Sequence, residues 1–250
     1  MGIIIKSPKE IEIMRQAGRI VAAVLDLLRR RIEPGITTGE LDAITARELS
    51  RYGVVSSFKG YRGFPAYLCV SVNDELVHGI PGERVLCEGD IVSLDVGVNV
   101  HGFHGDAALT VGVGKMRSEA DALLQATEGA LMAGIASAHS GAHLSDISAA
   151  IQSFVEAKRF SVVREYVGHG IGREMHEEPQ IPNFGLSGQG PVLKVGMTLA
   201  LEPMVNIGGW QTKVGSDGWT VTTADGNLCA HFEHTIAITN GEAEILTKLD

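Results

Sequence analysis

The chain has 250 residues, of which 44% are hydrophobic and 20% are charged. This length suits one large domain or two small ones, and the composition is typical of a globular protein with its own core. The formal net charge of −9 argues against a protein that binds DNA over its surface. The three cysteines are far apart and form no CxxC pair, which argues against disulfides or a structural zinc site and favours a reducing compartment.

The sequence shows no targeting or membrane-spanning segment. The first apolar run, 20–28, contains Asp26 and lies between Arg19 and Arg29, so it is too short and too charged to cross a bilayer. The basic run that follows, 29–31, is typical of a solvated helix end. We therefore predict a soluble, cytoplasmic protein that binds neither membrane nor DNA.

The first predicted element is a helix that begins at Ser7. Ser7 is a typical N-cap, Pro8 suits the first helical position, and Glu10 completes a capping box. Apolar residues then recur every three or four positions as far as Leu28. This pattern predicts an amphipathic helix that ends near 33–35, where Pro and Gly follow Glu.

Three more helices are predicted, and they repeat the arrangement of the first pair. A second helix begins at 37–40 and ends at Gly53; a third runs from Ser118 through Ile135, and a fourth follows 140–141. The helix entry 35–41 resembles 141–147, and the acid-bearing segment 89–95 resembles 196–202. The similar offsets predict one domain, 1–250, that contains an internal repeat of about 8–115 and 118–240.

Strands are predicted in the apolar segments between these helices. They lie at 69–72, 91–98, 103–113, 197–205, 219–223 and 231–239. Helix pairs that are grouped apart from neighbouring strands are typical of an α+β fold, with a mostly antiparallel sheet and the helices on one face.

Four of these apolar strands contain a carboxylate: Asp95, Asp106, Glu202 and Glu233. Burying an acid is costly unless it is paired, protonated or bound to a metal. In a hairpin that turns at about 99–102, Asp95 and Asp106 are expected to be direct cross-strand neighbours, with Cβ atoms roughly 5 Å apart. Glu202 occupies the repeat position of Asp95, and Glu233 lies on the strand that corresponds to that of Asp106. A pseudo-twofold axis therefore brings all four to a common centre, which predicts a cation.

His169 is the histidine expected to join these acids, because glycines on both sides of it allow a close approach. His234 points to the opposite face of its strand from Glu233 and is discounted. Purely structural roles are expected for His101, His104, His139, His143 and His231.

This mostly hard-oxygen donor set suits a pair of divalent ions such as manganese, iron or cobalt better than a structural zinc. Such a pair supports hydrolysis of an amide or a phosphoester. The acidic chain, with few cations near the centre, favours the amide.

The order Asp95, Asp106, His169, Glu202 and Glu233 resembles the metal set of the pita-bread metallopeptidases. These include methionine aminopeptidases, aminopeptidase P and prolidase. Type I methionine aminopeptidases are the most similar, through the segments 71–81, 168–173, 176–179 and 217–220. The resemblance implies a curved, mostly antiparallel sheet in two pseudo-twofold-related halves, with helix pairs on its outer face.

The resemblance also implies the role of each site residue. Two divalent ions (Co, Mn, Fe or Zn) are expected, one held by Asp95, Asp106 and Glu233, and the other by Asp106, His169, Glu202 and Glu233. Glu202 would accept the proton of the attacking water. The remaining roles are hydrogen bonding to the scissile amide, by His78 and His176, and enclosure of the methionine side chain, by Tyr61, Phe64, Cys69, His78 and Trp219.

The implied activity is removal of the initiator methionine from nascent chains with a small second residue. The implied partners are nascent N-termini and, transiently, the ribosome, with the enzyme acting as a monomer. Three positions depart from the common bacterial pattern and affect pocket shape: Phe58, Phe64 and Met175.

Two other hypotheses for the function compete with methionine removal. A peptidase of the same fold that cleaves before proline usually has an additional amino-terminal domain, which we do not expect here because the first helix begins at Ser7. A non-catalytic pita-bread module that only binds peptides would have lost metal ligands, whereas this chain has all five of the expected residue types.

Overall fold

A computed structural model describes residues 2–249. Its helices agree with the four that the sequence predicts: α1 (Pro8–Arg29), α2 (Thr38–Tyr52), α3 (Ser118–Ser137) and α4 (Leu144–Ala157). The capping box predicted at Ser7 is formed, a second capping box is found at Thr37, and Gly53 ends α2 in the left-handed conformation. A short 3-10 turn, η1 (Tyr61–Gly63), follows the first helix pair. Within 2–249, no helix is long and apolar enough to cross a membrane.

The strands form one large sheet and two small ones, and every pairing is antiparallel. The large sheet has the order β1-β4-β5-β14-β9-β7-β8, with β2 also paired to β4 and β15 to β14. Its strands are β1 (Val55–Ser56), β2 (Cys69–Val72), β4 (Ile91–Val100), β5 (Phe103–Gly112), β7 (Gly168–Gly170), β8 (Glu177–Ile181), β9 (Thr198–Leu201), β14 (Glu233–Ala237) and β15 (Glu244–Ile245). The small sheets contain β3 (Glu75–Val77), β11 (Thr212–Val214) and β12 (Val221–Thr223), and β6 (Ser161–Val162), β10 (Met204–Asn206) and β13 (Cys229–His231).

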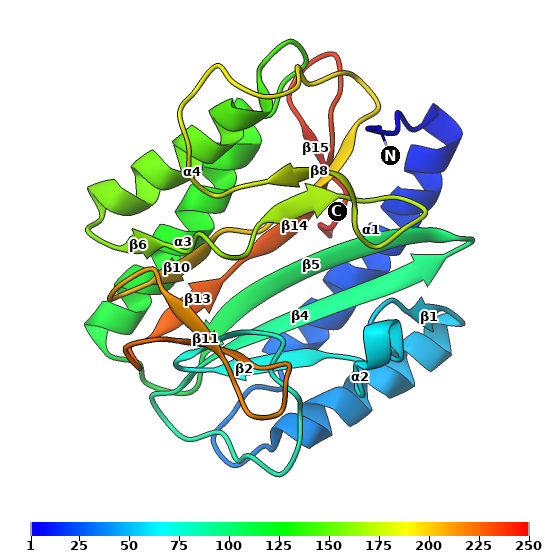
Figure 1. Cartoon of the computed structure of the whole chain (residues 1–250). Helices are drawn as coiled ribbons and strands as arrows, with labels where there is room; N and C mark the ends of the chain where they lie inside the picture. The colour runs from blue at the N-terminus through cyan, green and yellow to red at the C-terminus, as the bar shows by residue number, and fades with distance from the viewer. Residues whose placement is uncertain (1, 250) are drawn as a thin grey trace.

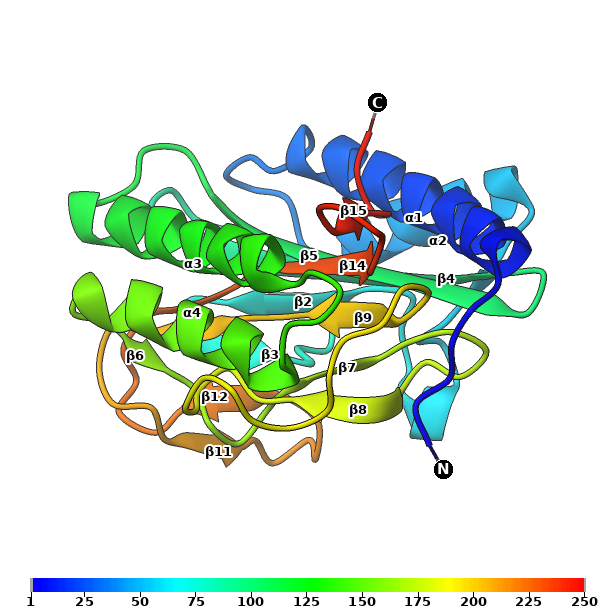
Figure 2. The same ribbon diagram turned by 90° about the horizontal axis from the view of Figure 1, so that it is seen from above.

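Each helix pair covers its own part of the large sheet (Figures 1 and 2). One apolar cluster joins α1 and α2 to β2, β4 and β5, and a second joins α3 and α4 to β9, β10 and β14. From the central pair β5–β14, the strands β4 and β2 continue on one side and β9 and β7 on the other. This arrangement is the predicted α+β fold, with helix pairs on one face of an antiparallel sheet.

Corresponding turns precede β4, which contains Asp95, and β9, which Glu202 directly follows. Gly89 and Gly196 have φ angles of 91° and 90°, in the left-handed region that favours glycine, and they lead into β4 and β9 respectively. The assignment of one domain with a repeat of 8–115 and 118–240 stays a prediction.

The helix α1 lies directly against the back of β5. An added Cβ at Gly105 of β5 would lie 3.0 Å from the Cβ of Ala17, and one at Gly18 of α1 would lie 2.2 Å from the carbonyl oxygen of Leu246. Gly105 therefore allows α1 to lie close to β5, and Gly18 allows the chain around Leu246 to lie close to α1. Because β5 also contains Asp106, the contact with α1 fixes one of the predicted ligands.

The prediction for the end of the first helix was wrong by about one turn. The helix ends at Arg29 instead of near 33–35. Leu28 is its last buried residue, and Arg29 and Arg30 both turn back to pair with Asp26. The basic run is thus a solvated helix end, as the sequence indicated.

Three predicted strands have different limits. The segment 197–205 is divided after β9, and 231–239 is divided at Phe232 between β13 and β14. Pro203 has no N–H to donate to a ladder, and its carbonyl oxygen accepts from the Phe232 N–H at 3.4 Å, so the two breaks are adjacent. The strand expected at 219–223 begins at Val221. The glycine-rich segment around 169, where no strand was predicted, forms β7 of the large sheet.

We predict that Gly18→Ala destabilises the protein by about 1–3 kcal/mol, because the added methyl group collides with rigid backbone. The gain of about 1 kcal/mol in helix propensity would offset only part of this cost. Urea denaturation gives the measurement, and Gln16→Ala, at an exposed position of the same helix, is the control. An unchanged midpoint for Gly18→Ala would show that α1 can move away from the chain around Leu246.

Candidate metal centre and active site

The β4–β5 hairpin places the first two acids. Its turn consists of residues 101–102, with φ angles of 50° and 82°, as required by a tight two-residue hairpin turn. The resulting register pairs Asp95 with Ala108 and Asp106 with Gly97. The expectation that the two acids are directly opposite was therefore wrong, because the turn is centred one residue later than expected. They are diagonal neighbours on one face of the hairpin, and each carboxyl affects the pKa of the other.

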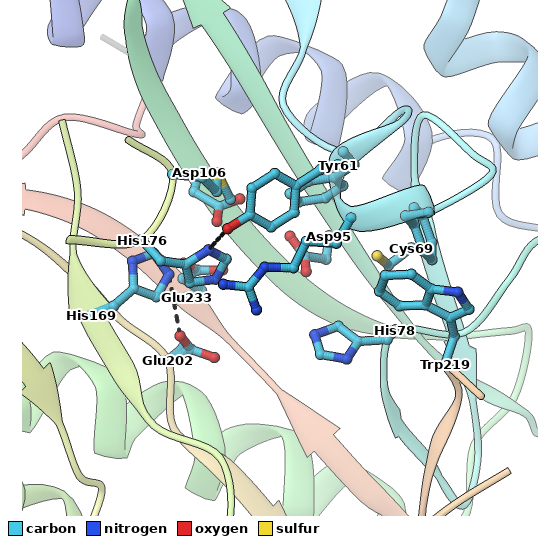
Figure 3. A pocket seen from close by; sticks show the side chains of 14 residues that line it. Tyr61, Cys69, His78, Asp95, Asp106, His169, His176, Glu202, Trp219 and Glu233 are labelled. Carbon is cyan, nitrogen blue, oxygen red and sulfur yellow. Dashed lines mark hydrogen bonds and ion pairs between the residues drawn. The ribbon is translucent and has the colours of Figure 1, made fainter. Parts of the chain in front are cut away.

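The other two acids come from the second half of the chain. Glu202 directly follows β9, and Glu233 is the first residue of β14, which pairs with both β5 and β9. One ligand atom from each of Asp106, His169 and Glu233 can be chosen so that all lie within 4.8 Å of one another. Figure 3 shows the four carboxylates and His169 around a common space. The structure therefore brings together the residues predicted to bind metal.

The electrostatics of this cluster strongly disfavour four ionised acids without a cation. Burial raises the pKa of Asp95 to about 7. Burial first, and then the neighbouring carboxylates, raise the pKa values of Asp106, Glu202 and Glu233 well above their ordinary range. Like charges in a site with little solvent repel strongly. A bound cation would reverse this effect and let all four acids ionise.

Unpartnered oxygens indicate where a cation would be held. Within the described residues, the buried atoms Asp95 Oδ1, Asp106 Oδ1 and Glu233 Oε1 accept no hydrogen bond. Nearly all buried polar groups in proteins have a partner, so three such oxygens at one place require an explanation. Carboxylate oxygens in this number fit a divalent cation.

The orientation of His169 fits the same cation. Its Nδ1 lies 2.9 Å from the carbonyl oxygen of Gly170, which can only accept, so Nδ1 has the hydrogen. Burial lowers the pKa of His169 to about 4, so the ring is neutral and Nε2 has a free lone pair. Nε2 lies 3.6 Å from Oε1 of Glu202. Because both atoms are acceptors, a metal ion between them would suit this arrangement.

His176 and His78 lie beside this cluster (Figure 3). Nδ1 of His176 lies 2.9 Å from the hydroxyl of Tyr61, and its ring centroid lies 4.3 Å from that of His169. Burial, and then His169, lower the pKa of His176 to about 3, and burial also lowers the pKa of His78. Both rings are therefore neutral at pH 7 and present one N–H each.

An apolar cluster lies next to the carboxylates. Phe64 meets Trp219 edge-on, with ring centroids 5.2 Å apart. The cluster consists of buried and partly buried side chains: Phe58, Tyr61, Phe64, Ala66, Cys69, Ile80, Met175 and Trp219. Phe58, Phe64 and Met175, the three positions expected to affect pocket shape, all lie in this cluster.

Every residue predicted for the site lines a single pocket. The lining residues are Phe58, Tyr61, Arg62, Phe64, Cys69, His78, Asp95, Asp106, His169, Met175, His176, Glu202, Trp219 and Glu233. As expected, His234 lies on the other face of β14, where its Nδ1 lies 2.9 Å from the hydroxyl oxygen of Thr247. His104 interacts with Ser57 and Asn99, away from the carboxylates.

The sequence analysis missed two residues near the centre. Arg62 lines the pocket from an exposed turn, and no sequence pattern indicated this. His231 was expected to be purely structural, but its Nε2 lies 3.9 Å from Oε2 of Glu202. Burial, and then His78, lower the pKa of His231 to about 3. Its spacing of two residues from Glu233, which places both on one face of an extended chain, was an available signal.

Comparison with known proteins gives close similarities along the whole chain. Residues 12–240 match metallopeptidase family M24. Methionine aminopeptidase 1 of Bacillus subtilis is 55% identical over 247 residues, which cover 99% of this chain and 100% of that protein. The crystal structure of methionine aminopeptidase from Thermotoga maritima has a TM-score of 0.98 at 49% identity, covering 99% of this chain and 100% of that one.

A more distant likeness concerns the fold alone. The prolidase from Pyrococcus furiosus has a TM-score of 0.81 at 22% identity, covering 99% of this chain and 66% of that chain.

We predict that Asp95→Asn stabilises the metal-free protein increasingly as pH rises from about 4 to about 7. The carboxyl of Asp95 has a higher pKa in the folded protein (about 7) than its ordinary value of 3.8. The folded state therefore binds an additional proton between these values, and the parent loses stability as pH rises through them. The difference in the free energy of unfolding between the variant and the parent should grow by on the order of 1 kcal/mol per pH unit.

Urea denaturation in chelator at pH 5, 6 and 7 measures this difference, and comparing variant with parent cancels the contributions of the buried histidines. Added Mn²⁺ should favour the parent, because Asn removes a charged ligand. A difference that does not change with pH would contradict the burial of Asp95 among like charges.

Proposed function

Because the chain belongs to metallopeptidase family M24, we propose that it removes the N-terminal methionine from peptides and newly made proteins whose second residue is small. One observation supports this reaction above the others. The residues Asp95, Asp106, His169, Glu202 and Glu233 surround one space that adjoins an apolar pocket. A hydrolytic centre beside a pocket for one apolar side chain is what such an aminopeptidase requires.

We propose that Asp95, Asp106, His169, Glu202 and Glu233 would hold two divalent cations. Cobalt, manganese, iron or zinc are the candidates, and the oxygen-rich donor set favours manganese, iron or cobalt. Such ions, when bound, polarise the scissile carbonyl and lower the pKa of a water molecule toward neutrality.

Glu202 is the proposed general base. It follows β9 directly and lies at the edge of the pocket, with a side chain that is 15% exposed, whereas Asp106 and Glu233 are almost fully buried. A water molecule in the pocket can therefore approach Glu202 more easily than Asp106 or Glu233. The main-chain oxygen of Glu202 accepts from the side-chain amide of Asn183 at 3.0 Å, which fixes the backbone next to Pro203.

His176 and His78 are the proposed donors to the substrate amide. If the hydroxyl of Tyr61 donates to Nδ1 of His176, then Nε2 has the hydrogen and is free to donate to a substrate carbonyl. His78 has a positive φ of 59°, a conformation uncommon outside glycine and one that local structure must enforce. Donors fixed in this way stabilise the charge that develops on the oxygen of the tetrahedral intermediate.

The apolar cluster is the proposed site for the methionine side chain. Tyr61, Phe64 and Trp219 supply aromatic edges and faces, and contact between a thioether and an aromatic ring is favourable. The free thiol of Cys69 lies at the wall, and burial raises its pKa well above the ordinary range, so it stays uncharged. A neutral, apolar wall favours methionine over charged residues.

The proposed setting is the cytoplasm, with a monomer that acts on nascent chains at the ribosome and makes no contact with DNA or membranes. The net charge of −9 supports a brief rather than a tight contact with ribosomal RNA. Cleavage before proline has less support, because the likeness to prolidase is confined to the fold.

Methionine release from Met-Ala-Ser and from Xaa-Pro peptides tests this proposal, using metal-stripped protein with added Mn²⁺, Fe²⁺, Co²⁺ or Zn²⁺. We expect metal-dependent cleavage of Met-Ala-Ser and none before proline. Cleavage only before proline would assign the chain to the Xaa-Pro peptidases. Absence of cleavage with every metal would favour a module that only binds peptides.

We further predict that Glu202→Gln lowers kcat by about 10²–10⁴-fold, the usual contribution of a general base. The amide keeps the size of the side chain, so the metal-free protein should remain folded, as circular dichroism can verify. Glu119→Gln, at an exposed position in the first turn of α3, is the matched control and should retain activity. Turnover of Glu202→Gln within tenfold of the parent would contradict the role of Glu202 as base.

A further inference from the structure

His231 is a buried histidine that the proposed mechanism does not use. It is the last residue of β13 and is only 2% exposed. Its Nε2 is buried and has no hydrogen-bond partner among the described residues. An unsatisfied buried polar atom is destabilising, so a purely apolar residue would fill this space at lower cost.

The backbone of His231 is fixed by the strand that contains Asp106. The hydroxyl of Thr110 on β5 donates to the carbonyl oxygen of His231 at 2.7 Å and accepts from its N–H at 3.0 Å. Because a hydroxyl has one hydrogen, Ser93 must be the donor in its own 2.8 Å contact with Thr110.

Asp106 is held in the reciprocal way. The hydroxyl of Thr235 donates to its carbonyl oxygen at 2.7 Å and accepts from its N–H at 3.1 Å. Thr110 and Thr235 thus make the same pair of hydrogen bonds to the main chains of His231 and Asp106. The main chain of His231 is therefore bound to a threonine of β5 in the same way as the main chain of Asp106 is bound to a threonine of β14.

The two oxygens of Glu202 face two different imidazoles. Oε1 lies 3.6 Å from Nε2 of His169, and Oε2 lies 3.9 Å from Nε2 of His231. The His169 nitrogen offers a lone pair, since its Nδ1–H donates to Gly170. The His231 nitrogen has no other partner, so it is free to present a hydrogen to Oε2.

We propose that His231 is a positioning residue for Glu202: its Nε2–H donates to Oε2 and thereby keeps Oε1 on the side of His169. The 3.9 Å separation closes by a small rotation of the Glu202 side chain, as catalytic hydrogen bonds often shorten when a site is loaded. Hydrogen bonds of this kind orient a metal-binding carboxylate and fix which oxygen binds. The activity arm of the test rests on the proposed aminopeptidase function; the metal-binding arm does not.

The test compares two variants of His231. Leucine removes the donor while keeping an apolar filling, and glutamine keeps an N–H at a similar reach. We expect His231→Leu to weaken Mn²⁺ binding, measured by calorimetry, or to lower kcat for Met-Ala-Ser by about 10–100-fold, with KM within about twofold. His231→Gln should remain within about threefold of the parent in both measurements.

Two controls separate positioning from packing. His234→Leu removes a partly buried imidazole from the opposite face of β14; it should lower the melting temperature and leave Mn²⁺ affinity unchanged. In the Glu202→Gln background, His231→Leu should cause no further loss of Mn²⁺ affinity, because the residue through which it acts has been altered.

Equal losses for the leucine and glutamine variants would overturn the proposal, and so would a full loss from His231→Leu in the Glu202→Gln background. Parent protein that binds Mn²⁺ but cleaves no peptide would refute the aminopeptidase function, and the calorimetric comparison would still decide the role of His231. Should the leucine variant fail to fold, the melting temperature shows it, and loss of Mn²⁺ affinity in a folded His231→Gln variant would overturn the proposal.

Discussion

The mutual repulsion of four carboxylates in one poorly solvated space is the constraint on which the rest of the structure depends. Asp95, Asp106, Glu202 and Glu233 all have pKa values raised by burial, and no cationic partner is found for them in the described chain. Such a cluster opposes folding unless cations are bound, so the surrounding structure must hold it together in the metal-free state. The large apolar clusters under the helices provide that stability.

The cluster of acids lies where β5 and β14 meet. Few backbone hydrogen bonds join these two strands, and two threonine hydroxyls bond across them instead. The ladder between β5 and β14 is short, with only Glu233 opposite Ala108 and His234 opposite Ala107. On either side of it, the hydroxyls of Thr110 and Thr235 replace the direct strand-to-strand bonds. The two threonines thereby help to keep these strands in register beyond the short ladder.

Local patterns predicted the elements well, because the interactions that define them are local. The capping box at Ser7 and the left-handed Gly53 mark helix ends through contacts within a few residues. The hairpin register was less predictable, since moving the centre of a turn by one residue changes every cross-strand pair. The strand break at Pro203 follows from a missing N–H, but its alignment with the break at Phe232 depends on a pairing between distant segments.

The sequence predicted the site residues whose type is unusual in its sequence context. It did not predict those whose type is common in that context. An acid inside an apolar strand is improbable, and each of the four lines the pocket. A histidine beside an acid is ordinary, and only the unpartnered Nε2 distinguishes His231 from a packed ring. His169 and His231 differ in one hydrogen bond. Nδ1–H of His169 donates to a main-chain carbonyl, so the lone pair of its Nε2 is free to bind a metal. Two neutral imidazoles on one carboxylate can therefore serve opposite purposes, one as a ligand and the other as a donor.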